Sequence, residues 1–90
     1  MVAETREIRL KRLAMRSMRR GIKEMDILLT RYADTRLADL DDAGLDAYEA
    51  LLSENDQDLY QWVSGQVTPP THHAAIVAQI AAVATSKSAE

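Results

Sequence analysis

Apolar residues recur at spacings of three and four along most of the chain, which is the period of an amphipathic α-helix. The spacing predicts a first helix from about Thr5 to Arg19 and a second from about Lys23 to Leu37. The apolar face of the first is Leu10, Leu13, Ala14, Ser17 and Met18; that of the second is Met25, Leu28, Leu29, Tyr32 and Ala33. Gly21 is expected to end the first helix, since glycine tolerates the left-handed closing conformation.

Three further helices follow. Asp41 is the expected N-cap of the third and Asp56 of the fourth, because a carboxylate there accepts a backbone N–H. The last helix is expected from about Thr71 to Thr85, after two prolines that interrupt the helical pattern. Their apolar positions are Leu45, Tyr48, Leu51 and Leu52; then Leu59, Trp62 and Val63; then Ile76, Val77, Ile80 and Val83.

No segment alternates as a strand would, so the pattern predicts an all-α fold. We expect a single domain, residues 1–90, built as a compact bundle of four to five short helices, with frayed tails at residues 1–4 and 86–90. Because the first connection is short, its two helices should form a hairpin. The predicted core is Leu13, Met18, Leu28, Leu29, Tyr32, Leu45, Tyr48, Leu52, Leu59 and Trp62.

The charges divide the chain into a basic arm and an acidic body. Residues 1–24 hold eight basic and three acidic side chains, whereas residues 25–90 hold three basic and eleven acidic ones. The acidic body argues against general nucleic-acid binding, including a helix-turn-helix module that uses the first helix. Apolar runs are too short to span a membrane, so we expect a cytoplasmic protein without membrane insertion, monomeric when free.

Chemical equipment for catalysis is sparse. Cysteine is absent, and no serine has a histidine and an acid at a suggestive spacing. His72 and His73 are adjacent, so on a helix they should point about 100° apart, exposed to solvent and unable to share a metal. The acidic clusters around Asp42 and Asp56 are read as helix caps, not metal sites. We therefore expect no enzyme, no catalytic residue and no bound metal.

The first connection concentrates opposite charges between two apolar helices, over Arg19-Arg20-Gly21-Ile22-Lys23-Glu24-Met25-Asp26. It can be read as a helix stop and a helix start with solvated arginines. It can also be read as a rigid turn that displays Arg20 and Glu24 to a partner, since the fixed fork of arginine suits charge-assisted hydrogen bonds. The residues alone leave both readings open.

The same segment resembles the succinate dehydrogenase assembly factor 2 family, also called bacterial FAD assembly factors. The stretch Arg20-Gly21-Ile22-Lys23-Glu24 is similar to the R-G-x-x-E signature of that family. It is preceded by Arg19 and followed by Met25-Asp26-Ile27, and Leu51-Leu52, Asp56, Asp58-Leu59-Tyr60 and Trp62 come later in the family's order. The resemblance covers roughly residues 10–70.

The resemblance implies a bundle of about five helices without enzymatic activity of its own. Members bind the flavoprotein subunit of succinate dehydrogenase, in some bacteria also that of fumarate reductase, and promote covalent attachment of FAD to a histidine of that partner. The flavin then belongs to the partner, and we expect no stable FAD binding by this chain alone. The partner-binding residues that it implies are Arg16, Arg19, Arg20, Gly21, Lys23, Glu24 and Asp26.

Two questions stay open at this point. Some relatives were described as antitoxins, so the alternative function is an antitoxin-like protein that neutralises a toxin partner. The arginines of the first helix, Arg9, Arg12 and Arg16, are equally compatible with partner docking and with a solvated face.

Overall fold

The computed structural model describes the backbone of residues 4–86 and contains five α-helices in that span. They are α1 (Arg6–Arg16), α2 (Lys23–Arg36), α3 (Asp42–Leu52), α4 (Asp56–Val63) and α5 (Thr71–Ser86), with a short 3₁₀ helix, η1 (Leu37–Asp39), after α2. No strand occurs among the described residues. The predicted all-α fold is confirmed, and most of the two expected tails lies outside the described residues.

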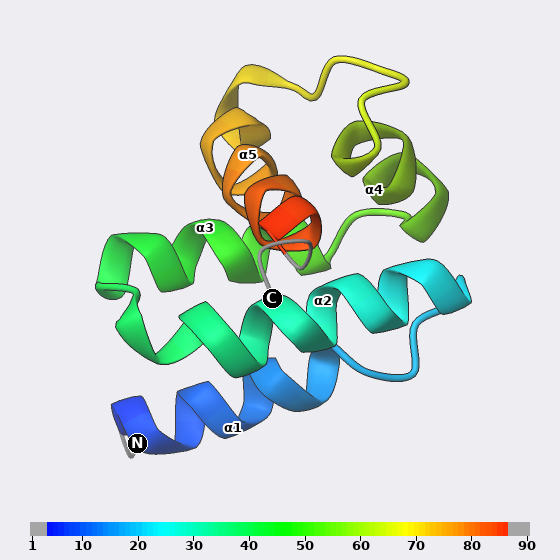
Figure 1. The fold of residues 1–90 in the computed structure, drawn as a ribbon. Coiled ribbons are helices and arrows are strands. Elements are labelled where there is room, and N and C mark those ends of the chain that lie inside the picture. Colours follow the sequence, from blue (N-terminus) through cyan, green and yellow to red (C-terminus); the bar gives the residue numbers. More distant parts are fainter. Residues whose placement is uncertain (1–3, 87–90) are drawn as a thin grey trace.

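The helices pack around α2, which contacts α1, α4 and α5. Figure 1 shows α1 and α2 as an antiparallel hairpin, with α3 beside α2 and α5 crossing over both. Buried apolar side chains from all five helices and η1 meet between these layers. They are Leu13, Met25, Leu29, Tyr32, Leu37, Leu45, Tyr48, Leu51, Leu52, Leu59, Ile76, Val77, Ile80 and Val83.

The predicted core is largely confirmed, with one error and two adjustments. Met18 is 45% exposed and not part of the core. Leu28 and Trp62 are partly buried and pack against the core from its margin. In their place α5 contributes four buried aliphatic side chains, so its Ala-rich sequence still presents a continuous apolar stripe.

Met18 was misplaced because α1 ends earlier than its periodicity suggests. The helix stops at Arg16, and the hydroxyl of Ser17 donates to the carbonyl oxygen of Leu13 at 2.8 Å. Gly21 does not close the helix: the residue with a left-handed backbone is Arg19, at φ 56°. Chain direction therefore changes three residues beyond α1, and Met18 turns outward.

Helix caps follow the expected chemistry, with one shift of register. Asp41 caps α3 by accepting the Gly44 N–H at 2.8 Å, as predicted. For α4 the cap is Asn55, which accepts the Gln57 N–H at 2.8 Å, and not Asp56. The carboxylate of Asp56 is thus free to bind elsewhere.

His73 corrects the expectation that both histidines face solvent. His72 is exposed, but His73 is 2% exposed and its Nε2 lies 2.8 Å from Oε2 of Glu54. The ring also packs near Trp62, with centroids 5.6 Å apart. The sequence indicated an exposed residue because His73 lies in the first turn of α5. It does not show that this side of α5 packs against Glu54, just before α4.

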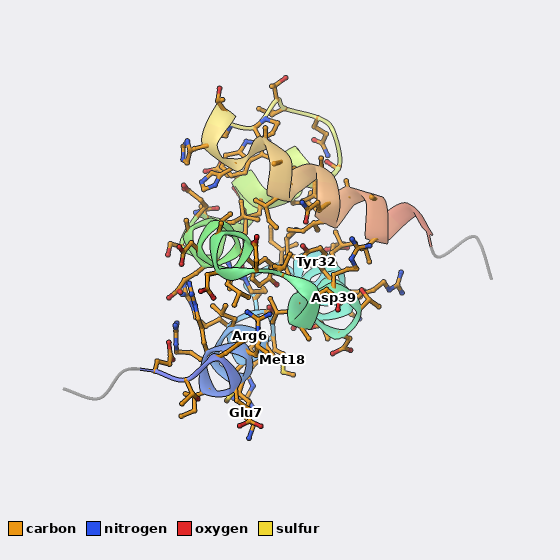
Figure 2. The ribbon with its side chains drawn as sticks, turned by 90° about the vertical axis from the view of Figure 1, so that its left-hand side faces the viewer. Arg6, Glu7, Met18, Tyr32 and Asp39 are labelled. Atoms are coloured by element: carbon orange, nitrogen blue, oxygen red, sulfur yellow. The ribbon has the colours of Figure 1, made fainter. Side chains whose placement is uncertain are left out.

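None of the described helices is long and apolar enough to cross a membrane. At the chain start, Glu4 was expected in a frayed tail, yet its carboxylate binds Arg12 with Oε2 2.7 Å from Nε. Figure 2 shows Arg6 near η1, where its guanidinium donates to the carbonyl of Ala38 at 3.0 Å and to that of Leu40. The start of α1 is therefore tied to the rest of the domain.

Candidate functional site: the turn between α1 and α2

The turn that carries the Arg-Gly-x-x-Glu pattern is braced by a carboxylate from α4. Nε of Arg20 donates to Oδ1 of Asp56 at 2.8 Å, and Nη2 lies 2.6 Å from the same oxygen. The side chains of Arg20 and Asp56 are only 12% and 16% exposed. An ion pair so shielded from water is stronger than one on an open surface.

Arg20 uses the rest of its guanidinium to bind helix ends. Nη1 donates to the carbonyl of Arg16 at 2.9 Å, and Nη2 to that of Leu52 at 3.2 Å. These are last-turn carbonyls of α1 and α3, which lack partners within their own helices. One side chain therefore fastens the ends of α1 and α3 to the start of α4.

Gly21 lies directly against the same carboxylate. Its backbone N–H donates to Oδ2 of Asp56, and a Cβ added at Gly21 would lie 3.1 Å from that oxygen. This distance is tighter than ordinary van der Waals contact, so a side chain here would push the carboxylate away. Glycine is needed at this position for close approach and not for a left-handed backbone.

The turn is also fixed from the other side. The backbone N–H of Arg19, held at φ 56°, donates to Oδ2 of Asp26 at 3.0 Å. Oδ1 of Asp26 accepts from the Thr30 hydroxyl at 3.3 Å. The backbone N–H of Arg19 and the carboxylate of Asp26 thus hold the turn against the start of α2.

The seven candidate residues consequently divide into three groups. Arg20, Gly21 and Asp26 make the internal contacts of the turn, and the expectation that Arg20 is displayed to a partner does not match its buried, occupied guanidinium. Lys23 and Glu24 are exposed, and their side chains, like that of Arg19, make no hydrogen bond or ion pair with the described residues. Arg16 is half-buried and faces α3.

The exposed residues of the turn form a mixed apolar and charged surface. We call Met18, Arg19, Lys23, Glu24 and Ile27 the turn surface. Met18 is 45% exposed and Ile27 is 49% exposed. Ile27 follows Glu24 by three residues on α2, so both lie on the same face of that helix. Methionine and arginine are enriched in protein–protein interfaces, so Met18 and Arg19 suit contact with another protein.

The arginines of α1 bind α3, which answers the question that the sequence left open. Arg9 Nη2 lies 2.6 Å from Asp46 and 3.0 Å from Glu49, and Arg12 Nη1 lies 2.7 Å from Glu49. Arg16 approaches Glu49 at 3.8 Å. The basic arm thus neutralises part of the acidic body. Arg9 and Arg12 are paired within the fold, whereas Arg16, with its side chain 36% exposed, makes only longer contacts and stays a predicted partner-binding residue.

These contacts shift the acid–base properties of the groups. Hydrogen bonds from Arg12 and then Arg9 hold the pKa of Glu49 below its ordinary value. The bond from Arg12 does the same to the pKa of Glu4. Both carboxylates therefore favour the charged form at neutral pH.

A shallow depression adjoins the turn. Its volume is about 360 Å³, and it is lined by Ile22, Gln57, Tyr60, Gln61 and Gln66. The lining carries no positive charge with which to hold a phosphate. Amide and phenol side chains around an isoleucine suit a side chain of a protein partner better than a dinucleotide.

Comparison with known proteins identifies the family of this chain. A model of the family described as "flavinator of succinate dehydrogenase" matches residues 11–84, which include the whole turn. The chain belongs to this family of succinate dehydrogenase flavinators. The match reaches residue 84, near the end of α5, and so extends beyond the residues that carry the resemblance.

Individual relatives of the flavinator family give the same result. The chain is similar to a protein of Meyerozyma guilliermondii named succinate dehydrogenase assembly factor 2, mitochondrial, with 47% identity over 73% of this chain and 50% of the relative. Proteins of the same name from Scheffersomyces stipitis and Mycosarcoma maydis are 46% and 36% identical, over 73% and 80% of this chain. The chain spans half or less of the length of these relatives, covering 46% and 30% of the last two.

Asp56 is the residue of the candidate site whose role the sequence analysis misread. It was noted within the resemblance but interpreted as a helix cap, because an acid before a helical pattern commonly has that role. Two signals pointed to Asn55 instead: asparagine is an equally good cap, and it leaves Asp56 in the first turn, where a carboxylate is also favoured. Its pairing with Arg20, 36 residues away, has no local signature.

Proposed function

We propose that this protein is an assembly factor that binds the flavoprotein subunit of succinate dehydrogenase and promotes covalent attachment of FAD to a histidine of that subunit. The carrying observation is the exposed, unpaired Glu24 on a turn that is held rigid by Arg20 and Asp56, in a chain that belongs to the flavinator family. In some organisms the client also includes the flavoprotein of fumarate reductase.

The braced turn supports this function by lowering the cost of binding. An exposed loop that must become ordered on association loses conformational entropy, and that loss weakens the complex. Here Asp56 and Asp26 fix the turn through Gly21 and Arg19 before any partner arrives. The turn surface then meets the flavoprotein with Glu24 already in place, able to accept charge-assisted hydrogen bonds.

The chain acts on flavinylation through binding and not as an enzyme. The bond joins a nitrogen of the partner's histidine to the methyl carbon of the partner's flavin, so both reacting atoms lie outside this protein. Holding them in alignment can supply much of the barrier reduction. We propose that the monomer binds the immature flavoprotein, favours the aligned arrangement of its histidine and flavin, and dissociates afterwards.

We propose further that the isolated chain binds no FAD stably. The depression beside Gly21 is shallow, and its lining offers glutamines and a tyrosine but no cation for the pyrophosphate. The arginines of α1 that could serve a phosphate are occupied by Asp46 and Glu49. Any contact with the flavin would therefore arise only in the complex.

In-gel flavin fluorescence of the succinate dehydrogenase flavoprotein tests this function. Cells with and without the gene for this chain are compared at equal flavoprotein abundance on an immunoblot. Loss of fluorescence on deletion, restored by the wild-type gene, is the expected result. Unchanged fluorescence would contradict the proposal and favour the antitoxin-like alternative, in which a toxin partner co-purifies with the chain.

A further inference from the structure

A cluster of metal-ligating side chains lies outside the turn, where α5 begins against the connection between α3 and α4. Among the described residues, Glu54, His72 and His73 bring one potential ligand atom each within 4.8 Å of one another. Nε2 of His73 is 2.8 Å from Oε2 of Glu54, and the two imidazole centroids are 4.0 Å apart. Two imidazoles and one carboxylate thus lie close enough together for one ion to reach all three.

Adjacent histidines converge here because of their place in α5. Side chains of a helix lean towards its N-terminus, and in the first turn no preceding turn separates neighbouring side chains. His72 and His73 are the second and third residues of α5. Their rings therefore approach each other, although their Cα–Cβ bonds diverge as the helix period requires.

The burial of His73 adds an independent observation. Its side chain is 2% exposed, and Nδ1 is buried without a hydrogen-bond partner among the described residues. A buried imidazole with one unmet nitrogen is unfavourable as mere packing, since an apolar side chain would avoid that cost. No hydrogen bond fixes the protonation of Nδ1, so Nδ1 can carry the ring proton and leave the lone pair of Nε2, on the side of Glu54, for a ligand.

We propose that Glu54, His72 and His73 bind a divalent transition metal of the zinc class, with one coordination position open to solvent. Two histidines and a glutamate with a fourth open position are a known donor set for Zn²⁺. Around a tetrahedral ion with ligand distances of about 2.0 Å, neighbouring donors lie roughly 3.3 Å apart. Glu54 and His73 are already near that separation, and the exposed His72 side chain can rotate to complete the site.

The ion would take the place of the hydrogen bond between Glu54 and His73, with the ring proton of the neutral imidazole on Nδ1. Zinc binding weakens in acid, because a protonated imidazole cannot act as a ligand. The bound metal would also fasten the start of α5 to the segment that leads into α4. Glu54 precedes Asp56 by two residues, so the site stabilises the part of the chain that braces the turn.

Zinc titration of the full chain, prepared without a histidine tag, tests the site. Calorimetry and the melting temperature are recorded with Zn²⁺, and with Mg²⁺ as the ion that the donor set should not retain. We expect saturable 1:1 zinc binding and a rise in melting temperature. Absence of zinc binding to the wild-type chain would overturn the proposal.

Matched variants locate the bound metal. His72→Ala removes an exposed ligand, and Glu54→Gln keeps a hydrogen-bonding partner for His73 but loses the carboxylate charge. Both should weaken zinc binding by about 100-fold or more while retaining the metal-free melting temperature. Asp58→Asn, the same change of charge on an exposed residue of α4, should bind zinc as the wild type does. Equal binding by all three variants would place the metal elsewhere and refute the site.

Discussion

Arg20 and Asp56, 36 residues apart in the sequence, form the ion pair that joins the turn after α1 to the start of α4. The oxygen Oδ1 of Asp56 lies 2.6 Å from Nη2 of Arg20, while Oδ2 accepts the Gly21 N–H. One carboxylate therefore fixes both the side chain and the backbone of the turn. The exposed Glu24 owes its position to a contact that is itself largely hidden from solvent.

Removing this carboxylate should destabilise the fold. Asp56→Ala leaves the shielded guanidinium of Arg20 and the Gly21 N–H without their acceptor, and we expect a loss of about 3 kcal/mol in the free energy of unfolding. Urea denaturation followed by circular dichroism measures it. Asp58→Ala is the matched control, since Asp58 lies in the same first turn of α4 but is exposed. Equal losses in both variants would mean that the effect comes from the helix dipole.

The network between α1 and α3 makes stability depend on pH. The pKa of Glu49 is lowered from its ordinary value of 4.5 by Arg12 and Arg9, so its contribution is present above that pH and is lost as the pH falls below it. Glu49→Gln should cost about 1 kcal/mol or less at pH 7, because such partly exposed pairs are screened. The difference from the wild type should shrink in thermal melts as the pH falls below 4.5.

Glu7→Gln provides the control for that pH series. Glu7 is exposed, its side chain makes no ion pair or hydrogen bond with the described residues, and Figure 2 shows it pointing away from the body of the protein. Its substitution should leave the pH dependence unchanged. A Glu49→Gln variant whose deficit persisted undiminished at low pH would show that the side chain acts through packing and not through charge.

Ser17 and Tyr48 form a buried hydrogen bond between α1 and α3. Their oxygens are 2.5 Å apart, and because Ser17 donates to the Leu13 carbonyl, the Tyr48 hydroxyl is the donor between them. Ser17→Ala should cost about 1–3 kcal/mol by leaving that hydroxyl unpaired. Tyr48→Phe should reduce the free energy of unfolding by less than Ser17→Ala does. The double variant should lose less stability than the sum of the losses in the two single variants. Strict additivity in urea denaturation would contradict the coupling.

The same tyrosine predicts the behaviour at high pH. Burial raises the pKa of Tyr48 from 10.0 to about 12. The folded state therefore keeps a proton that the unfolded state loses, so stability should fall as the pH rises from about 10 to 12. Tyr48→Phe should remove this part of the alkaline loss, which thermal melts across that range would detect. An identical alkaline decline in the variant would contradict the assignment.

Sequence patterns predicted the helices well because local periodicity and caps carry that information. Leu13, Leu29 and Leu59 occupy helical spacings whose buried face needs no knowledge of distant residues. The errors arose where a residue distant in the sequence determines where a helix ends or whether a side chain is buried. At the end of α1, the Ser17 hydroxyl is hydrogen-bonded to the Tyr48 hydroxyl of α3. The helix does not continue beyond that contact, and Met18 is exposed.

The sequence singled out the charged turn between the first two helices but not the contacts that its residues make. The density of charge between two apolar helices indicated the turn. Whether Arg20 faces a partner or Asp56 depends on the packing of α4 against that turn, which no local pattern encodes. His73 was misread for a similar reason, because only the tertiary structure brings Glu54 to its ring.

The central claim is that Glu24 acts in flavinylation through an exposed side chain and not through the fold. Its most direct test is in-gel flavin fluorescence of the succinate dehydrogenase flavoprotein in deletion cells that express the wild type, Glu24→Ala or Glu7→Ala. Glu7 and Glu24 are both exposed glutamates in the first turn of a helix, so the two variants share the same effect on helix stability.

We predict that wild type and Glu7→Ala restore the fluorescence and that Glu24→Ala does not, with melting temperatures of the purified variants close to that of the wild type. Full restoration by Glu24→Ala at equal expression would contradict the central claim. A marked fall in the melting temperature of Glu24→Ala alone would contradict it as well, because the residue would then act through stability.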